Sequence, residues 1–374
     1  IVDYPARGLA PEIFAMRLKN KMFHNVSYLN MFKRYSTLKK LFDDYKIGRK
    51  VISALVLSCA FSVQAASSLP LQELIQQLGI LQQDLVKLEQ GKVVSFQITE
   101  NDNKELAAGV AIYASSAPIK VIEFLRNKGM ISIDTEIISQ SLISPQTTLS
   151  SFKELNFKLG DKNEENLLAA KPGDTFNLSA QEFKALQTIS QGHTDSIAEV
   201  YRNILFERWQ AYRKEGLKGI ATYDRGSGKV SDPGKELRIA ILSNKVLPNH
   251  FPELYQFWLN YPAVIPANAE ERFFLINRQV ENRATAVLLH RIILAENAGG
   301  IILSRQFYVG HSYNSNQFII GCLPYRNGSL IFYTNRTFTD QVTGFGSSLK
   351  HSVGREQMRR RMEKHLINIK NALK

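Results

Sequence analysis

The segment Gly310-His-Ser-Tyr-Asn314 has the Gly-x-Ser order of a turn that presents a nucleophilic serine. Such a turn joins a strand to a helix, and it needs a small residue two positions after the serine because its backbone is strained and crowded. Here that position holds Asn314, and the residues after it have the pattern of a strand. We therefore expect a polar turn between strands, with no catalytic role for Ser312.

Two glycine-containing segments can be compared with nucleotide-binding loops. In Gly226-Ser-Gly-Lys229, Tyr223 stands where a phosphate loop has its first glycine, and Val230 replaces the hydroxyl residue after the lysine. Gly344-Phe-Gly346 follows no strand–helix–strand unit, which a dinucleotide-binding loop requires. The sequence predicts no cofactor.

A transition-metal site needs histidine, cysteine or carboxylate side chains clustered at helical or strand spacing. The histidines of the chain are scattered singly, without a neighbouring cysteine, and the paired carboxylates lie in polar segments typical of solvated surface. We predict no metal site from the sequence, although convergence in space is left open. The histidines after position 65 are His193, His250, His290, His311, His351 and His365.

The strongest candidate for a binding site is a band of polar and aromatic residues near the C-terminal end. Its two segments adjoin strand ends that precede the last helix, and pockets combine apolar walls with a few polar groups that orient a ligand. The alternative is that Asn, Asp and Ser in these segments only form turns. The band comprises Tyr308, His311, Tyr313, Asn314, Asn335, Arg336, Phe338 and Asp340.

The elements that would position this band are five extended runs followed by a helix. Short consecutive strands joined by turns indicate an antiparallel meander. The last helix, over about 353–373, has an apolar stripe at helical spacing, which predicts that it packs on the sheet. The strands are expected at 271–280, 284–296, 300–309, 316–323 and 329–336, and the stripe at Met358, Met362, Leu366, Ile369 and Leu373.

The first half of the chain mixes both element types. A leucine-rich helix is expected over 70–89, and a helical insertion over about 140–262 includes a capping box at Ser179-Ala-Gln-Glu182. Strands alternate with a short helix between these two regions. Those elements are expected at 93–99, 106–114, 118–129 and 130–139.

This order of elements predicts an α+β fold in which a curved antiparallel sheet of about eight strands grips a long C-terminal helix. One helix cannot fill the concavity of a broad sheet, so we expect a cavity between the two. Met358 and Met362 would line that cavity from the helix.

Two resemblances bear on this fold. The strand-to-helix segment 109–125, with the C-terminal helix, resembles the helix-grip fold of the START-like lipid-transfer superfamily. The segments 171–179, 305–316 and 335–346 resemble an uncharacterised group of exported bacterial proteins. The first resemblance implies a hydrophobic ligand between sheet and helix, with the insertion at 140–262 as a departure from the usual plan. The second implies bacterial origin and export, and lends no activity.

The N-terminal region has the three-part pattern of a secretory signal. Basic residues after Met31, a plausible start, precede the apolar run Val51–Phe61, and small residues follow up to Ala65. We expect residues 1–65 to be an upstream extension and signal peptide, and 66–374 a single α+β domain in the periplasm or secreted. A lipoprotein modified at Cys59 is the lesser alternative. After cleavage Cys322 would remain alone and form no internal disulfide.

Charge argues against nucleic acid as a partner. The formal charge is +13, but residues 1–66 contribute a net +7 and the other 308 residues only +6. Nucleic-acid binding needs a concentrated basic patch, whereas Arg355, Arg359, Arg360 and Arg361 fit a solvated helix face. No segment after Ala65 contains 18 consecutive apolar residues, so no integral membrane segment is expected there.

The leading hypothesis is therefore a non-enzymatic carrier or sensor of a hydrophobic or lipid-like molecule, with room for peripheral contact with a membrane. Two alternatives stay open. The polar band would serve a hydrolase of the envelope, or residues 70–90 would bind a protein partner in an envelope interaction module.

Overall fold

The computed structural model describes residues 71–374 apart from positions 159, 174, 190–195 and 297–298. The described residues belong to one compact unit. The expected signal peptide, with Met31, Cys59 and Ala65, lies outside the described residues.

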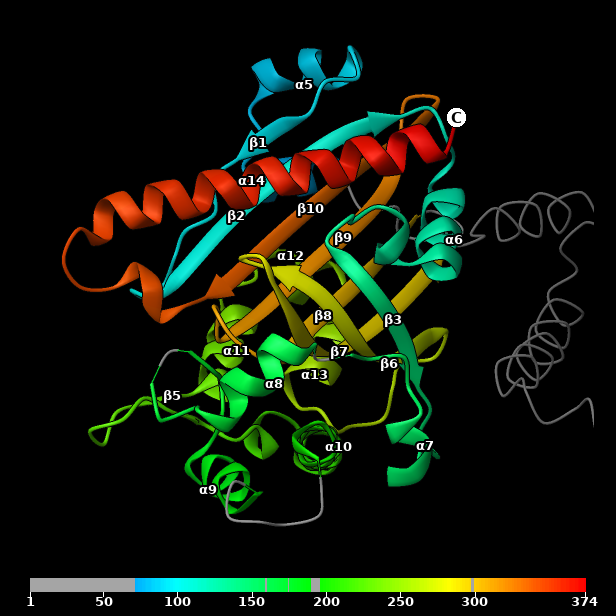
Figure 1. Cartoon of the computed structure of the whole chain (residues 1–374). Helices are drawn as coiled ribbons and strands as arrows, with labels where there is room; N and C mark the ends of the chain where they lie inside the picture. The colour runs from blue at the N-terminus through cyan, green and yellow to red at the C-terminus, as the bar shows by residue number, and fades with distance from the viewer. Residues whose placement is uncertain (1–70, 159, 174, 190–195, 297–298) are drawn as a thin grey trace, which may run out of the picture. The chain divides into compact units, whose positions relative to one another are not determined.

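An antiparallel sheet of eight strands forms the centre of this unit, in the order β1-β2-β10-β9-β8-β7-β6-β3 (Figure 1). The five strands β6 to β10 are sequential neighbours, as the meander predicted. Between β6 and β7, Glu281 and Asn282 have φ of 48° and 62°, the paired positive values of a tight hairpin turn whose twist matches the strands. The strands are β1 (Val94–Phe96), β2 (Glu105–Ala114), β3 (Ile137–Ile143), β6 (Ala269–Val280), β7 (Arg283–Glu296), β8 (Gly299–Val309), β9 (Ser315–Tyr325) and β10 (Gly328–Phe338).

Successive side chains of a strand point to opposite faces, so this sheet has two apolar faces, and both are covered. We call them the insertion face and the α14 face. The insertion face packs against the helices between β3 and β6, and the α14 face packs against α6 (Pro118–Lys128) and α14 (Ser347–Ala372). Typical members are Leu275, Leu288, Leu303 and Ile319 on the insertion face, and Ile276, Val287, Ile302 and Ile320 on the α14 face.

The helical insertion begins later than expected, because β3 occupies part of the range 140–262. The strand expected at 130–139 is also displaced: residues 130–132 form a single 3₁₀ turn and β3 starts at Ile137. The capping box at Ser179 and Glu182 is present at the start of α9. The helices are α7 (Leu149–Lys153), α8 (Asp161–Leu168), α9 (Ala180–Ile189), α10 (Ile197–Glu215), α11 (Pro233–Leu242), α12 (Val246–His250) and α13 (Pro252–Leu259), and a small hairpin of β4 (Tyr223–Asp224) and β5 (Val230–Ser231) precedes α11.

The leucine-rich helix expected over 70–89 is two helices, α4 (Leu71–Leu78) and α5 (Gln82–Glu89). Gly79, with φ of 78°, ends the first helix in a conformation that costs glycine little. Leu74, Ile75 and Leu78 are buried in the core on the insertion side. This segment therefore contributes to the core of the unit, through these residues of α4 and through Leu88 of α5.

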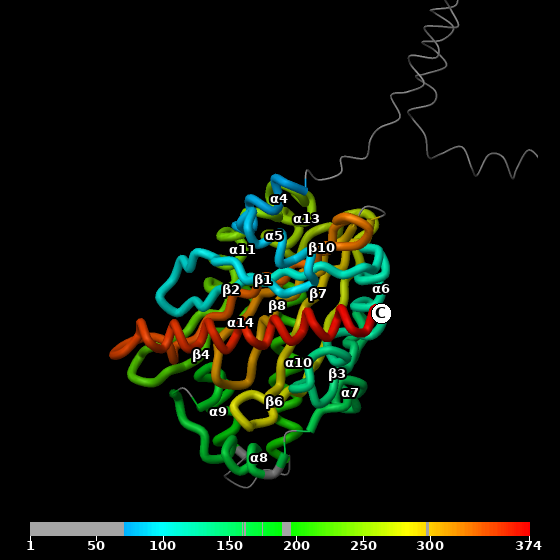
Figure 2. The backbone as a smooth tube through the Cα atoms, turned by 90° about the horizontal axis from the view of Figure 1, so that it is seen from above, coloured from blue at the N-terminus to red at the C-terminus, as the bar shows by residue number. Residues whose placement is uncertain are grey.

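The C-terminal helix α14 lies mainly along β2, with less contact to β10 (Figure 1). Its C-terminal end lies beside α6 in both views (Figure 2), where the Ser116 hydroxyl donates to the Leu373 carbonyl at 3.0 Å. The expected stripe is buried at Met358, Met362, Leu366 and Ile369. The α+β class, the large antiparallel sheet and the C-terminal helix are thus confirmed.

Candidate functional site

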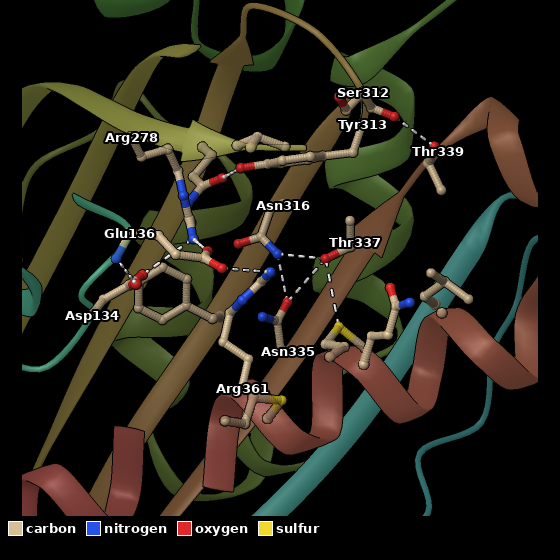
Figure 3. Close-up of a pocket in the computed structure, with 18 of the residues that line it drawn as sticks. Asp134, Glu136, Arg278, Ser312, Tyr313, Asn316, Asn335, Thr337, Thr339 and Arg361 are labelled. Carbon is tan, nitrogen blue, oxygen red and sulfur yellow. Dashed lines mark hydrogen bonds and ion pairs between the residues drawn. The ribbon is translucent and has the colours of Figure 1, made fainter. Parts of the chain in front are cut away.

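A cavity of about 550 Å³ lies between the α14 face of the sheet and α14 itself (Figure 3). Strands β6 to β10 contribute its floor, α14 one wall, and the segment between α6 and β3 another. Its apolar lining comes from sheet and helix together. Those apolar residues include Leu106, Met130, Ile276, Val287, Leu289, Phe318, Val342, Met358 and Met362.

A network of ion pairs closes one side of the cavity. Arg278 of β6 contacts Asp134 at 3.2 Å and Glu136 at 2.6 Å, and Arg361 of α14 reaches Glu136 at 3.0 Å (Figure 3). Burial alone would raise the pKa of Asp134, but the nearby His365 and the Arg278 charge hold this pKa well below its usual range. The network therefore stays charged at neutral pH and joins α14 to the sheet.

Neutral polar groups line the floor beside this network. The Asn316 amide donates to Asn335 Oδ1 at 2.5 Å and to Thr337 Oγ1 at 2.7 Å (Figure 3). The Tyr313 hydroxyl donates to Gln306 at 2.7 Å. These groups can orient a ligand by hydrogen bonds while the apolar lining holds the rest of it.

Arg291 of β7 also lines the cavity, and its side chain is 2% exposed. Its Nε donates to Ser304 Oγ at 3.1 Å, and its guanidinium lies 5.2 Å from the centre of the Phe274 ring. Within the described part of the chain, its Nη2 is buried without a hydrogen-bond partner. Burial, followed by the charge of Arg272, lowers the pKa of Arg291 to about 10, so the group remains a cation at neutral pH.

Four of the residues that the sequence singled out line this cavity: Tyr313, Asn335, Met358 and Met362. Tyr308 lies on the insertion face, where its hydroxyl is 2.9 Å from that of Tyr201. The reason is a β-bulge: Leu288 pairs with Tyr308 and Leu289 with Gln306, so Phe307 is an extra residue.

The other five residues of the predicted site do not line the cavity either. Arg336 points to the insertion side, where it pairs with Glu105, and Phe338 is fully buried on the same side of β10. Strand alternation places both opposite Asn335. Asn314 and Asp340 belong to one further polar group, and His311 belongs to another; both groups are described next.

Asn314 belongs to a buried polar cluster on the insertion side. Arg225 donates to Asn314 Oδ1 at 2.8 Å and to Asp340 at 3.0 Å, and the Asn314 amide donates to Glu236 at 2.8 Å. Burial raises the pKa of Glu236 to about 7, against hydrogen bonds from Asn314 and Ser315 that lower it. These groups bind one another, so we assign the cluster a structural role.

His311 and Ser312 sit at the edge of the cavity. His311 Nδ1 is 2.6 Å from Ser312 Oγ, which donates to Glu281 at 2.7 Å, and Ser312 has a positive φ of 72°. Burial, followed by the charge of Arg283, lowers the pKa of His311 to about 3. Its imidazole is therefore neutral but weakly basic, which makes it a poor general base.

The charged residues of the cavity were not found from the sequence. Asp134 and Glu136 lie in the range 130–139, where a strand was expected and no binding role was assigned, and Arg361 was assigned to a solvated helix face. Arg291 did carry a signal, because together with His290 it interrupts the apolar run Val287–Leu294. A charge placed within a buried strand is uncommon and indicates either a paired structural group or a binding group.

Two classes of site are not observed in the described ranges. These residues contain no group of three or more His, Cys, Asp or Glu side chains placed to hold a metal ion. Among the helices that the structure describes, none is both long and apolar enough to cross a membrane.

The sequence was compared with protein families and with curated proteins. No protein-family model matches the chain, and no curated protein matches it.

Proposed function

We propose that the protein binds a hydrophobic or lipid-like small molecule in the cavity between the sheet and α14, as a carrier or sensor. The observation that carries this proposal is the cavity itself. Its volume of about 550 Å³ lies within the range of small-molecule sites, roughly 300–1,000 Å³. Its lining also combines apolar side chains with many polar and charged ones, which can orient a ligand.

The proposal includes a helix-grip arrangement of the START-like kind, and export to the periplasm or beyond. The cavity between the sheet and the C-terminal helix supports the first part. The basic, apolar and small-residue pattern ending at Ala65 supports the second. The likeness to exported bacterial proteins agrees with it.

Exposed apolar side chains next to the cavity favour transfer to and from a membrane. Phe345, just before α14, is fully exposed, and Leu349 and Val353 are 71% and 48% exposed. The spacing of four residues puts Leu349 and Val353 on one side of the helix, and both line the cavity along with the exposed Lys350. An apolar edge with a cation beside it suits contact with an anionic lipid surface.

The test is to extract the purified full chain with organic solvent and analyse the extract by mass spectrometry. A bound ligand should appear as a lipid-like species at a constant ratio to protein. An empty extract, together with no binding to an array of lipids, would remove the proposal.

A hydrolase is the second candidate, favoured by the contact between His311 and Ser312 at the cavity edge. Its test is hydrolysis of short- and long-chain nitrophenyl esters by the wild type and by Ser312→Ala. Ester hydrolysis that disappears in the variant would support the enzyme, and activity that persists would exclude Ser312 as its nucleophile.

A further inference from the structure

The arginines that line the cavity differ in whether a carboxylate neutralises their charge. Arg278 and Arg361 share the carboxylates Asp134 and Glu136. Arg291 is buried, whereas Arg278 is only partly buried, yet no carboxylate among the described residues is paired with Arg291. Its contacts there are one hydroxyl, that of Ser304, and the face of the Phe274 ring.

The surroundings of Arg291 increase the local excess of positive charge. Across the sheet it is paired in register with Arg272, which binds Glu270. Arg126 contacts the same carboxylate at 3.2 Å. This corner thus has three guanidinium groups and one carboxylate. A buried cation without a counter-ion is costly, and an apolar side chain of similar size would be tolerated better.

The geometry of Arg291 fixes which of its donors remain for a ligand. Because Nε is held by Ser304, the plane of the guanidinium is oriented, and Nη2 is a donor with no partner in the described protein. The apolar residues Val287 and Leu289 of the same strand line the cavity beside it. A guanidinium edge matches the two oxygens of a carboxylate.

We propose that Arg291 binds the carboxylate of a single-chain amphiphile, such as a fatty acid, whose hydrocarbon chain lies on the apolar floor of the cavity. This inference rests on the proposed function and narrows its ligand class. Arg291 is kept at a cost to the stability of the empty protein because it neutralises the acidic head group when the ligand is bound.

The test compares palmitate with 1-hexadecanol, which has the same chain length and no charge. We expect the purified full chain to bind palmitate about ten to a hundred times more tightly than hexadecanol. The reason is that charge-assisted hydrogen bonds from Arg291 stabilise only the palmitate complex. Arg291→Met should abolish this preference by weakening palmitate alone. Arg291→Lys should keep part of it, since lysine retains the charge without the fork of donors.

Thermal unfolding supplies a control for folding. Without ligand, Arg291→Met should melt at or above the wild-type temperature, and palmitate should raise the melting temperature of the wild type more than that of Arg291→Met. Arg278→Met should melt lower, because it removes the charge that Asp134 and Glu136 share.

Three outcomes would overturn the inference. If wild type binds palmitate and hexadecanol equally, and Arg291→Met changes neither, the cavity binds lipids but Arg291 does not select acids. If Arg291→Met lowers the melting temperature and leaves palmitate affinity unchanged, Arg291 is a structural residue. If neither palmitate nor hexadecanol binds the wild type, both the proposed lipid-binding function and the inference about Arg291 are contradicted.

Discussion

Arg305 and Arg291 lie on adjacent strands, are both buried, and face opposite sides of the same sheet. On the insertion face, the terminal nitrogens of Arg305 donate to the Tyr212 hydroxyl at 2.8 Å and the Trp258 carbonyl at 2.7 Å. Its guanidinium also lies 4.1 Å from the centre of the Trp258 ring. On the α14 face, Nη2 of Arg291 finds no such partner among the described residues.

The contrast teaches that the two faces are built for different purposes. The helices of the insertion approach closely enough to supply aromatic rings and backbone carbonyls to a buried cation. On the other face, α14 lies along β2, and the strands farther along the sheet border a cavity. The insertion face is therefore a closely packed core, whereas the α14 face borders a cavity, and it is there that we propose a ligand binds.

The largest expected effect that separates the faces is on stability. Arg305→Met should lower the free energy of unfolding by about 3 kcal/mol, because it leaves the Tyr212 hydroxyl and the Trp258 carbonyl buried without their donor. Urea unfolding of this variant beside Arg291→Met provides the matched comparison. Similar losses in both variants would contradict the distinction between the faces.

The next effect concerns pH on the insertion side. The folded-state pKa of Glu236 is about 7, above its ordinary 4.5, so the folded protein binds this proton more tightly. The stability that the protonated Glu236 side chain contributes is fully present below about pH 4.5 and is lost as the pH rises through 7. Glu236→Gln should therefore be about 1–2 kcal/mol more stable than wild type at pH 8 and equal to it at pH 4.5. Parallel stability–pH curves for the two proteins would argue against a raised pKa.

A bulky side chain in the cavity should affect binding rather than folding. Met358→Trp should weaken palmitate binding about tenfold, or 1.4 kcal/mol, because the indole occupies space that the ligand needs. Ile367→Trp is the control, since Ile367 is on the same helix but 44% exposed. Equal palmitate affinity in the two variants would move the ligand out of this cavity.

The smallest effect is expected at the exposed edge. Phe345→Ser should weaken binding to phosphatidylglycerol vesicles by about 1–2 kcal/mol, the value of one buried aromatic ring at most. Val264→Ser is the control, because Val264 is 94% exposed and lies in another segment, between α13 and β6. Vesicle flotation that is unchanged by Phe345→Ser, or reduced equally by both variants, would exclude a specific role for this edge.

The strands could be predicted from the sequence wherever apolar alternation and turn residues agree. The residues that line the cavity could not be predicted in the same way. The five strands of the meander and the buried stripe of α14 follow directly from apolar periodicity. Alternation alone also separates Asn335 from Arg336, so the expected band was too broad from the start. The bulge at Phe307 moves Tyr308 to the insertion face, and no local sequence pattern predicts such an extra residue.

Long-range pairing explains what else the sequence did not reveal. Arg278 and Asp134 are 144 residues apart, and Arg361 and Glu136 are 225 apart. Their side chains meet only because the sheet order places β3 beside β6 and because α14 lies over the same face. Helix breaks are local, yet the break at Gly79 was missed because leucines continue on both sides of it.

Photo-crosslinking with a palmitate that carries a diazirine in its chain tests the central claim most directly. After irradiation of the full chain, peptide mapping should place the label on residues of the α14 face, such as Leu289, Met358 and Met362, and excess palmitate should prevent it. Labelling confined to the insertion face or to exposed loops, or labelling that excess palmitate does not reduce, would contradict a ligand site between the sheet and α14.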